Sequence, residues 1–333
     1  MTQNTPIPNT FGISVRAREY VEYTSVAELQ DLLARYLGQR IFHIGAGSNL
    51  LFTKDFDGVI FHSRICFARA LREDDRTVDI EVGAGIVLDQ LIAQVADMGL
   101  YGLENLSHIP GEVGASAVQN VGAYGVEAKD LITEVHTVEV ATGSERIFTN
   151  AECRYAYRDS IFKTELKGQY IVTSVVYRLS KQPAPCLEYG NIRAALAGAD
   201  PTPLNIREAV IRIRKQKLPE PQQLGSAGSF FKNPVVTPAH FAEILQTEQK
   251  TEADIPHYPT DCGIKIPAAW LIEQCGWKGK AQGGAQVYEK QPLVIVNTGT
   301  ATPADIMQLA AQIIDSIRTR FGITLSPEVN YIE

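Results

Sequence analysis

The sequence predicts an α+β fold built from three domains. Its 333 residues exceed the length of one average domain, so two or three domains are expected. Amphipathic helices alternate with short strands in the first and last parts, whereas the middle part is richer in strands. The composition, with 45% hydrophobic and 21% charged residues, is that of a globular protein and excludes a disordered chain.

The first domain is expected to span residues 1–68. Ser25 and Glu28 form a capping box, which predicts the start of a helix. Strands are expected over residues 41–44 and 58–61, because both are short apolar runs bounded by glycine or turn residues. The apolar face of the helix consists of Leu29, Leu32, Leu33 and Tyr36.

The second domain is expected to span residues 69–205 and to be rich in strands. A strand over 77–82 leads into a helix that Gly99 ends. Residues 134–148 are typical of a hairpin, and a further strand is expected over 170–179. The proline-rich stretch 183–203 predicts either a linker or a loop laid over a site.

The third domain is expected to span residues 206–323. A helix over 206–216 ends in a basic cluster, and prolines follow it. Two more helices should begin near Pro238 and Pro267. A strand over 293–296 precedes a long helix that begins at Pro303 and is capped by Thr302, and the chain closes on strand-like residues at 327–332.

Several classes of protein are disfavoured by composition. The net charge of −7 argues against a dedicated nucleic-acid-binding protein, which usually carries a basic face. The five cysteines are odd in number and widely spaced, which favours reduced thiols in the cytoplasm over a zinc site or disulfides. The six histidines lack paired ligand spacing, so no metal is expected. Neither a signal peptide nor a membrane-spanning run is recognisable.

A glycine-rich turn, Gly45-Ala-Gly-Ser-Asn49, follows the strand at 41–44. Successive N–H groups in such a turn can point at a pyrophosphate. The third glycine of the dinucleotide fingerprint is missing, because position 50 is leucine, and no helix pattern follows. An ordinary dinucleotide-binding unit is therefore disfavoured, and a simple strand-to-strand turn is the alternative.

A second glycine-rich segment extends from Ile109 to Gly125. It offers few large side chains to fill a core, so it is suited to receive a flat, polar ligand. Backbone groups and the side chains of Ser116, Gln119 and Asn120 could supply hydrogen bonds. The alternative is a glycine-rich surface loop.

Three further segments carry chemically useful side chains. Ser229 lies in Gly225-Ser-Ala-Gly-Ser-Phe-Phe-Lys-Asn-Pro234, where small residues allow a close approach to a ligand. Arg158 could grip a carboxylate, although an ion pair with Asp159 at the surface is the simpler interpretation. Glu328 near the C-terminus could equally be a solvated charge.

In this order, the motifs resemble those of the UDP-N-acetylenolpyruvoylglucosamine reductase family, in a longer variant that carries the Tyr189 loop. The resemblance implies two domains that bind non-covalent FAD in the manner of vanillyl-alcohol oxidases, and a third, α/β domain that binds substrate. It implies that segment 324–333 returns to the first domain. The implied FAD-binding residues are Gly45, Ala46, Gly47, Ser48, Asn49, Leu50, Pro110, Gly111, Gly114, Ala115, Ser116, Gln119, Asn120 and Gly122.

The resemblance also implies a reaction. NADPH would reduce the flavin, and hydride would pass from flavin N5 to C3 of the enolpyruvyl ether of UDP-N-acetylglucosamine while Ser229 protonates C2. Arg158 would stabilise the developing charge. Glu328 could do so only when protonated, because a bare carboxylate would repel that charge. The implied substrate-binding residues are Tyr189, Arg214, Lys217 and Asn233.

The product would be UDP-N-acetylmuramate for peptidoglycan, which implies a part in cell-wall biogenesis, cell shape and cell division. We expect a cytoplasmic monomer that binds neither nucleic acid nor membrane. Two rival functions stay open: a flavin-dependent sugar or alcohol oxidase with the same FAD domain, and a nucleotide-binding module without catalytic activity.

Overall fold

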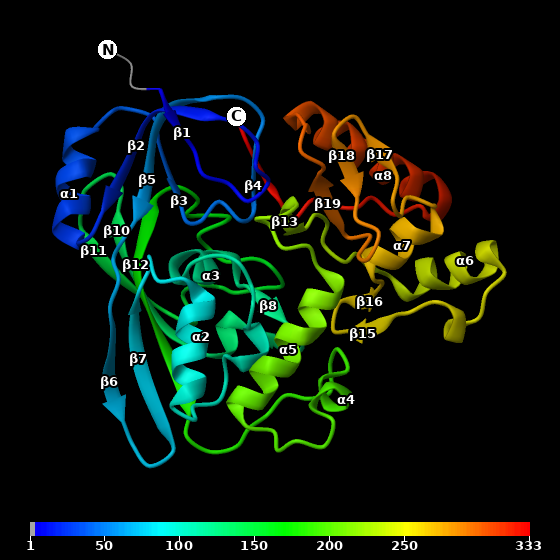
Figure 1. The fold of residues 1–333 in the computed structure, drawn as a ribbon, viewed down its shortest axis with the longest axis horizontal. Coiled ribbons are helices and arrows are strands. Elements are labelled where there is room, and N and C mark those ends of the chain that lie inside the picture. The colour runs from blue at the N-terminus through cyan, green and yellow to red at the C-terminus, as the bar shows by residue number, and fades with distance from the viewer. Residues whose placement is uncertain (1–3) are drawn as a thin grey trace. The chain divides into compact units, whose positions relative to one another are not determined.

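The computed structural model describes residues 4–333 and divides the chain into two compact units (Figure 1). The first unit contains the described residues up to Ile7 together with Arg16–Gly47 and Phe56–Gln216. The second unit contains Pro8–Val15, Ser48–Asp55 and Lys217–Glu333. Both units mix helices and strands, so the predicted α+β class is confirmed.

The two units differ from the three predicted domains in number and in some of the segments they contain, and the predicted boundaries stay a prediction. Residues 8–15 and 48–55 belong to the C-terminal unit, although the sequence places them in the first domain. Strand β4 (Leu50–Phe52) pairs in parallel with β20 (Asn330–Ile332), and the ring of Phe11 packs on Phe230 at 6.4 Å. These contacts join segments that are far apart in the sequence. Residue 68 lies at the start of β6 (Ala68–Glu73), between the two sheets of the first unit, and the helix expected to open the third domain belongs to the first unit as far as Gln216.

A four-stranded sheet forms one part of the first unit, with the order β1-β2-β5-β3. The β1–β2 pair is antiparallel and the other two pairs are parallel. These strands are β1 (Thr5–Pro6), β2 (Arg16–Tyr23), β3 (Ile41–Ile44) and β5 (Phe56–Ser63).

Helix α1 (Val26–Arg35) packs on this sheet through Leu29, Leu33 and the following Tyr36. Ser25 caps the helix by accepting a hydrogen bond from the backbone N–H of Glu28. The carboxylate of Glu28 turns back to the N–H of Thr24, one residue before the partner that a capping box would use.

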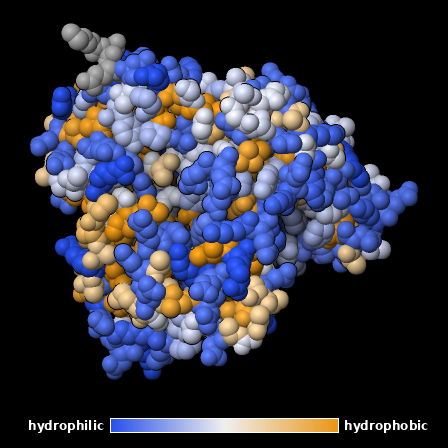
Figure 2. All heavy atoms as spheres, in the orientation of Figure 1, coloured by the Kyte–Doolittle hydropathy of each residue, from blue (hydrophilic) through white to orange (hydrophobic). Residues whose placement is uncertain are grey.

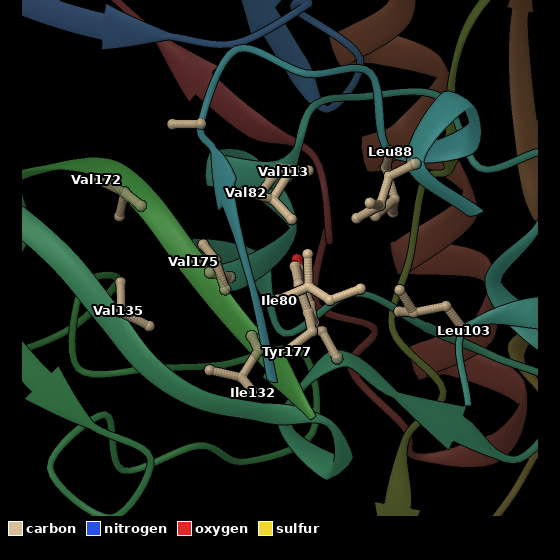
Figure 3. Packing of buried hydrophobic residues seen from close by; sticks show 14 of the residues in the cluster. Ile80, Val82, Leu88, Leu103, Val113, Ile132, Val135, Val172, Val175 and Tyr177 are labelled. Atoms are coloured by element: carbon tan, nitrogen blue, oxygen red, sulfur yellow. The ribbon is translucent and has the colours of Figure 1, made fainter. Parts of the chain in front are cut away.

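The second sheet of this unit is antiparallel, with the order β11-β10-β12-β7-β6. Helices α2 (Leu88–Asp97) and α3 (Val113–Gln119) contribute to the apolar core on one face (Figure 3). Leu88 and Val113 contribute from the helices, and Ile80, Val82 and Tyr177 from the strands. The strands are β6 (Ala68–Glu73), β7 (Thr77–Gly83), β10 (Ile132–Glu139), β11 (Glu145–Thr149) and β12 (Tyr170–Ser180).

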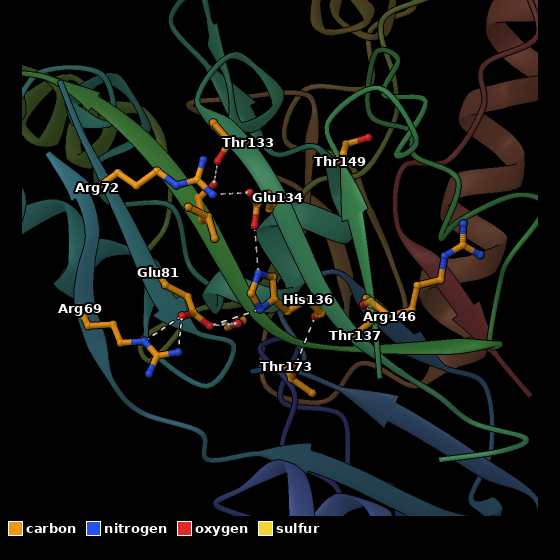
Figure 4. Close-up of polar contacts among 12 residues, drawn as sticks. Arg69, Arg72, Glu81, Thr133, Glu134, His136, Thr137, Arg146, Thr149 and Thr173 are labelled. Atoms are coloured by element: carbon orange, nitrogen blue, oxygen red, sulfur yellow. Dashed lines mark hydrogen bonds and ion pairs between the residues drawn. The ribbon is translucent and has the colours of Figure 1, made fainter. Parts of the chain in front are cut away.

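The same sheet carries a polar network (Figure 4). Glu81 on β7 accepts hydrogen bonds from Arg69 and Ser174. His136 on β10 lies 3.4 Å from Glu81 and 3.3 Å from Glu134. The predicted hairpin and the strand at 170–179 are confirmed as β10, β11 and β12.

Shorter elements complete the first unit. Helix α5 (Pro203–Lys217) begins three residues earlier than predicted, and its ion pair between Arg207 and Asp89 ties it to α2. The predicted proline-rich loop contains one short helix, α4, which packs on α5. The remaining elements are η1 (Glu104–Leu106), β8 (Gly122–Ala123), β9 (Val126–Glu127), η2 (Ala128–Asp130) and α4 (Ile192–Leu196).

The second unit contains an antiparallel sheet with the order β13-β19-β18-β17 and a three-stranded sheet with the order β14-β16-β15. Helix α8 (Pro303–Phe321) starts with the predicted capping box of Thr302 and Asp305. Helices begin at Pro238 and next to Pro267, as expected. The other elements are β13 (Gly225–Ser229), β14 (Val235–Val236), α6 (Pro238–Glu248), η3 (Glu252–Asp254), β15 (Tyr258–Thr260), β16 (Gly263–Lys265), α7 (Ala268–Gln274), β17 (Ala281–Gln282), β18 (Ala285–Val287) and β19 (Val294–Asn297).

Hydrophilic residues dominate the visible face of the molecule, and apolar residues are interspersed among them (Figure 2). Over residues 4–333, no helix combines the length and the apolar character needed to cross a membrane. The same residues contain no group of three histidine, cysteine, aspartate or glutamate side chains that could hold a metal ion.

Candidate functional site

The two glycine-rich segments meet within the first unit. Gly45 follows the end of β3, and a Cβ built on it would lie 3.4 Å from the Cβ of Ala115 and 3.1 Å from Oε2 of Glu112. The turn leads to β4 rather than to a helix, so the expected departure from a dinucleotide fingerprint is confirmed. The structure therefore brings the first part of the turn, Gly45–Gly47, beside the second segment.

The second segment is more regular than the sequence suggested. Pro110 and Gly111 lead into helix α3. This helix was not predicted, because the segment is rich in glycine, which disfavours helices. Gly114 has no side chain, so α3 can approach the end of β7 closely. The backbone N–H of Gly114 then donates a hydrogen bond to the carbonyl of Ala84 at 3.0 Å. A Cβ on Gly114 would lie 2.8 Å from the Cβ of Ala84, closer than two methyl groups can come.

Gly114→Ala is therefore expected to destabilise the protein by about 1–3 kcal/mol, because the added methyl overpacks the contact with Ala84. Chemical denaturation of the variant measures the loss. The double variant Gly114→Ala with Ala84→Gly moves the methyl to the other side of the same contact and should recover most of the stability. Equal losses in the single and double variants would contradict this account.

Most polar side chains of the second segment are engaged inside the protein. Ser116 is buried, and its Oγ lies 2.7 Å from the carbonyl of Val113 and 2.9 Å from the hydroxyl of Tyr177. The amide of Asn120 donates to Glu127 and to the carbonyl of Ala156, and its oxygen accepts from the N–H of Lys129. The side chains of Ser116 and Asn120 thus shape the segment. Their part in binding a ligand stays a prediction.

Arg158 is held in a constrained position of the first unit. Its φ of +55° is in the left-handed region, which costs a residue other than glycine about 1–3 kcal/mol, a strain that is often stored at functional sites. Its Nη2 donates to the carbonyl of Gly122, and its Nη1 lies 3.6 Å from Oε1 of Glu127. A Cβ on Gly122 would lie 2.8 Å from Nη1, so a larger residue at this position would displace the guanidinium.

Lys163 stabilises the position of Arg158. Nζ of Lys163 donates to the carbonyl of Arg158 at 3.0 Å and to Oε1 of Gln119 at 2.8 Å. The side chain of Arg158 is only 18% exposed, and the Asp159 carboxylate accepts from the N–H of Ser160. A simple surface pair between Arg158 and Asp159 therefore does not describe the site.

In the second unit, the structure brings the Ser229 segment and the C-terminal segment together. The N–H of Glu328 donates to the carbonyl of Phe230 at 2.8 Å, and Phe231 forms a bridge with Pro327. Ser229 ends β13 and pairs with Val294 of β19. The backbone of the Ser229 segment thus lies beside the backbone of the Glu328 segment.

Asn49 lies beside this segment in the same unit. Its Nδ2 donates to the carbonyl of Glu328 at 3.3 Å, and its own carbonyl accepts from the N–H of Asn330 at 3.1 Å. Ser48, Asn49 and Leu50 belong to the second unit, whereas Gly45, Ala46 and Gly47 belong to the first. No residue pattern in the sequence indicates that the turn is divided in this way.

The four predicted substrate residues are divided between the units. In the first, Nε of Arg214 donates to the carbonyl of His108 at 3.1 Å, and the half-exposed ring of Tyr189 packs on Gly125. In the second, Lys217 is exposed at the end of α5, and Oδ1 of Asn233 accepts from the N–H of Ala268 at the start of α7. Glu127 was not predicted as a partner of Arg158, because the two residues are far apart in the sequence.

Comparison with known proteins identifies the family. Residues 220–332 match the model of the UDP-N-acetylenolpyruvoylglucosamine reductase C-terminal domain, and residues 17–149 match that of an FAD binding domain. A UDP-N-acetylenolpyruvoylglucosamine reductase of Bacteroides fragilis is 49% identical over 327 residues, covering 97% of both chains. The chain belongs to the UDP-N-acetylenolpyruvoylglucosamine reductase family.

Two further matches agree with this assignment. The UDP-N-acetylenolpyruvoylglucosamine reductase of Porphyromonas gingivalis is 47% identical and covers 97% of this chain and 96% of its own. The crystal structure of the reductase from Thermus caldophilus has a TM-score of 0.68, with 22% identity and full coverage of both chains, and so shares the fold. The fold is therefore an FAD-binding module followed by a C-terminal domain, as the sequence predicted.

The residues of the first unit fit FAD, the cofactor of this family. Gly45 packs against Ala115 and Gly114 against Ala84, and all four residues lie within residues 17–149, which match the FAD binding domain. The nearby histidine on β3 is engaged elsewhere, because Nε2 of His43 lies 2.8 Å from the hydroxyl of Tyr23. Burial lowers the pKa of His43 to about 3, and the neighbouring His62 contributes, so the ring stays neutral.

Proposed function

We propose that this chain reduces the enolpyruvyl ether of UDP-N-acetylglucosamine to UDP-N-acetylmuramate, with NADPH as reductant and FAD as cofactor. The observation that carries the proposal is the match to reductases of that name along nearly the whole chain. A part in peptidoglycan synthesis, and through it in cell shape and division, follows from this product. We also propose that the enzyme acts in the cytoplasm as a monomer.

FAD would take hydride from NADPH and deliver it to C3 of the enolpyruvyl group, and the protein must manage the charge that remains at C2 and the carboxylate. Arg158 is suited to that task, because a guanidinium is always charged and can hold a carboxylate by two parallel N–H groups. Its position is fixed by Gly122, Glu127 and Lys163 before substrate arrives. Preorganised donors of this kind stabilise developing charge most effectively.

Ser229 would supply the proton to C2. A serine hydroxyl is a weak acid in water, but a carbanion-like centre is a strong base, so transfer is reasonable at hydrogen-bond distance. The bond between the Glu328 N–H and the Phe230 carbonyl fixes the backbone next to Ser229. The carboxyl group of Glu328 would assist at C2 when it carries a proton.

Four side chains would hold the uridine diphosphate part of the substrate. Arg214 and Lys217 supply positive charge near the end of α5, where a diphosphate is attracted. Asn233 and Tyr189 add an amide and a phenol that can hydrogen-bond to phosphate oxygens.

The test is a two-step titration of the purified holoenzyme. NADPH should bleach the flavin absorption, and the enolpyruvyl substrate should restore it with formation of UDP-N-acetylmuramate. A flavin-dependent sugar oxidase would instead be bleached by a free sugar. Loss of colour with a sugar, or no response to the enolpyruvyl substrate, would overturn the proposal.

The flavin is expected to be bound without a covalent link. The turn at 45–49 offers only glycine, alanine, serine and asparagine, and His43 is engaged with Tyr23. Acid precipitation of the holoenzyme should therefore release all flavin into the supernatant, where absorption measures it. Flavin that stays with the precipitated protein would contradict this expectation.

A further inference from the structure

A buried carboxylate and a buried imidazole lie behind the first glycine-rich turn. Glu112 and His62 are each 4% exposed, and Oε1 of Glu112 lies 2.8 Å from Nε2 of His62. Neither residue has a part in the proposed reaction. Buried groups of this kind are costly unless they are paired, so the two side chains depend on each other.

The pair is anchored to strand β2 through Tyr20. Its hydroxyl lies 2.7 Å from Nδ1 of His62. Burial, helped by the nearby Glu22, raises the pKa of Tyr20 to about 12, so the hydroxyl keeps its proton and can donate it to Nδ1. With that tautomer, the other ring nitrogen donates to Glu112. Glu22 also lies 3.4 Å from Nδ1 and is itself paired with Arg64 at 2.7 Å.

The second oxygen of Glu112 contacts the glycine-rich turn. A Cβ built on Gly45 would lie 3.1 Å from Oε2 of Glu112, so the carboxylate fills the space beside this glycine. Glu112 directly follows Gly111 of the second segment and precedes α3. One side chain therefore connects β5, which carries His62, with both segments that are predicted to bind FAD.

We infer that Glu112 and His62 are a positioning pair that fixes the Gly45–Gly47 turn against the start of α3 and thereby sets the affinity for FAD. The pair acts through the turn and does not itself touch the cofactor. The inference rests on the proposed place of Gly45, Ala46 and Gly47 in the FAD site. Since a pyrophosphate is an anion, a Glu112 carboxylate released from His62 would both displace the turn and repel the ligand.

The experiment measures how tightly full-length holoenzyme variants retain FAD. The dissociation constant follows from flavin fluorescence on serial dilution. His62→Ala leaves a buried carboxylate unpaired and should weaken FAD binding about tenfold or more. Glu112→Gln keeps the shape and an oxygen that accepts from His62, and should cost less than about threefold. The double variant should bind FAD more tightly than His62→Ala, because a neutral amide replaces the unpaired carboxylate, and more weakly than Glu112→Gln, because that buried amide has lost its partner.

His136→Ala is the matched control. His136 also lies between carboxylates, Glu81 and Glu134, in the same unit (Figure 4). It lies on the five-stranded sheet and none of its hydrogen bonds or ion pairs is to a glycine-rich segment. This variant should retain FAD as the unaltered protein does, and its thermal unfolding shows what loss of a histidine–glutamate contact alone costs.

A second pair of variants serves if His62→Ala does not fold. Gly45→Ala should weaken FAD binding in the unaltered protein, because its methyl presses on Glu112. In a protein that already carries Glu112→Asp, the shorter side chain leaves room for the methyl. There, Gly45→Ala should reduce the affinity for FAD several-fold less than it does when Glu112 is present. The inference is overturned if, in both sets of variants, the fold-losses in FAD affinity of the single variants simply multiply in the double variant. It is also overturned if no variant changes the affinity for FAD. If the unaltered protein itself fails to retain FAD, the proposed FAD site fails as well.

Discussion

Ser229→Ala is expected to leave reduction of the flavin by NADPH near its original rate and to slow reoxidation by the enolpyruvyl substrate severely. The first step needs no proton at substrate C2, whereas the second does. General acid catalysis commonly contributes about 10²–10⁴-fold, and a strongly basic centre at C2 would place the loss at or above the upper end. Stopped-flow absorption of the flavin measures the two steps separately.

The control for this variant is Ser226→Ala in the same strand. Ser226 is buried, and its backbone N–H donates to the carbonyl of Thr10, so it tests whether any serine of β13 is needed for folding. Both steps should survive in that variant. If Ser229 only fills the tight turn after Gly228, Ser229→Ala should be tolerated too. Equal slowing of both steps would indicate a defect in folding or flavin binding, and Ser229 would lose its role as proton donor.

Elements with local signals could be predicted from the sequence. The starts of helices α1 and α8 are predicted by their capping residues, Ser25 in α1 and Thr302 with Asp305 in α8. A cap is a local signal, because its side chain bonds to backbone groups only a few residues away. The hairpin of β10 and β11 follows likewise from alternation around a short turn.

Helix α3 could not be predicted, because its residues Val-Gly-Ala-Ser-Ala-Val-Gln favour no helix on their own. Burial of Val113 and Ala117 in the core shared with β7 and β12 stabilises it instead. The placement of residues 8–15 in the C-terminal unit is likewise decided by distant contacts, such as that of Phe11 with Phe230.

In the candidate site, too, the residue types could be read from the sequence, whereas contacts between distant residues could not. The motifs indicated Arg158, Ser229 and Glu328, because residue type and order are written in the sequence. The contacts that hold Arg158 were not foreseen, since Gly122 and Glu127 lie more than thirty residues earlier and its left-handed backbone has no local signature. The sequence suggests Asp159 as the partner because it is adjacent, but adjacency along the chain does not decide which side chains meet.

Arg158→Lys is expected to lose about 10²–10³-fold in reoxidation of the reduced enzyme while FAD content stays unchanged. Lysine keeps the charge, but its single ammonium cannot hold a carboxylate by two parallel N–H groups or bridge Gly122 and Glu127 together. Arg154→Lys is the matched control, because Arg154 is also left-handed but is paired with Glu165 at the surface. Stopped-flow traces should show the control unimpaired in both steps. If Arg158→Lys kept its original rate in both steps, Arg158 would have no place at the reacting carboxylate, and the strained backbone at this position would need another explanation.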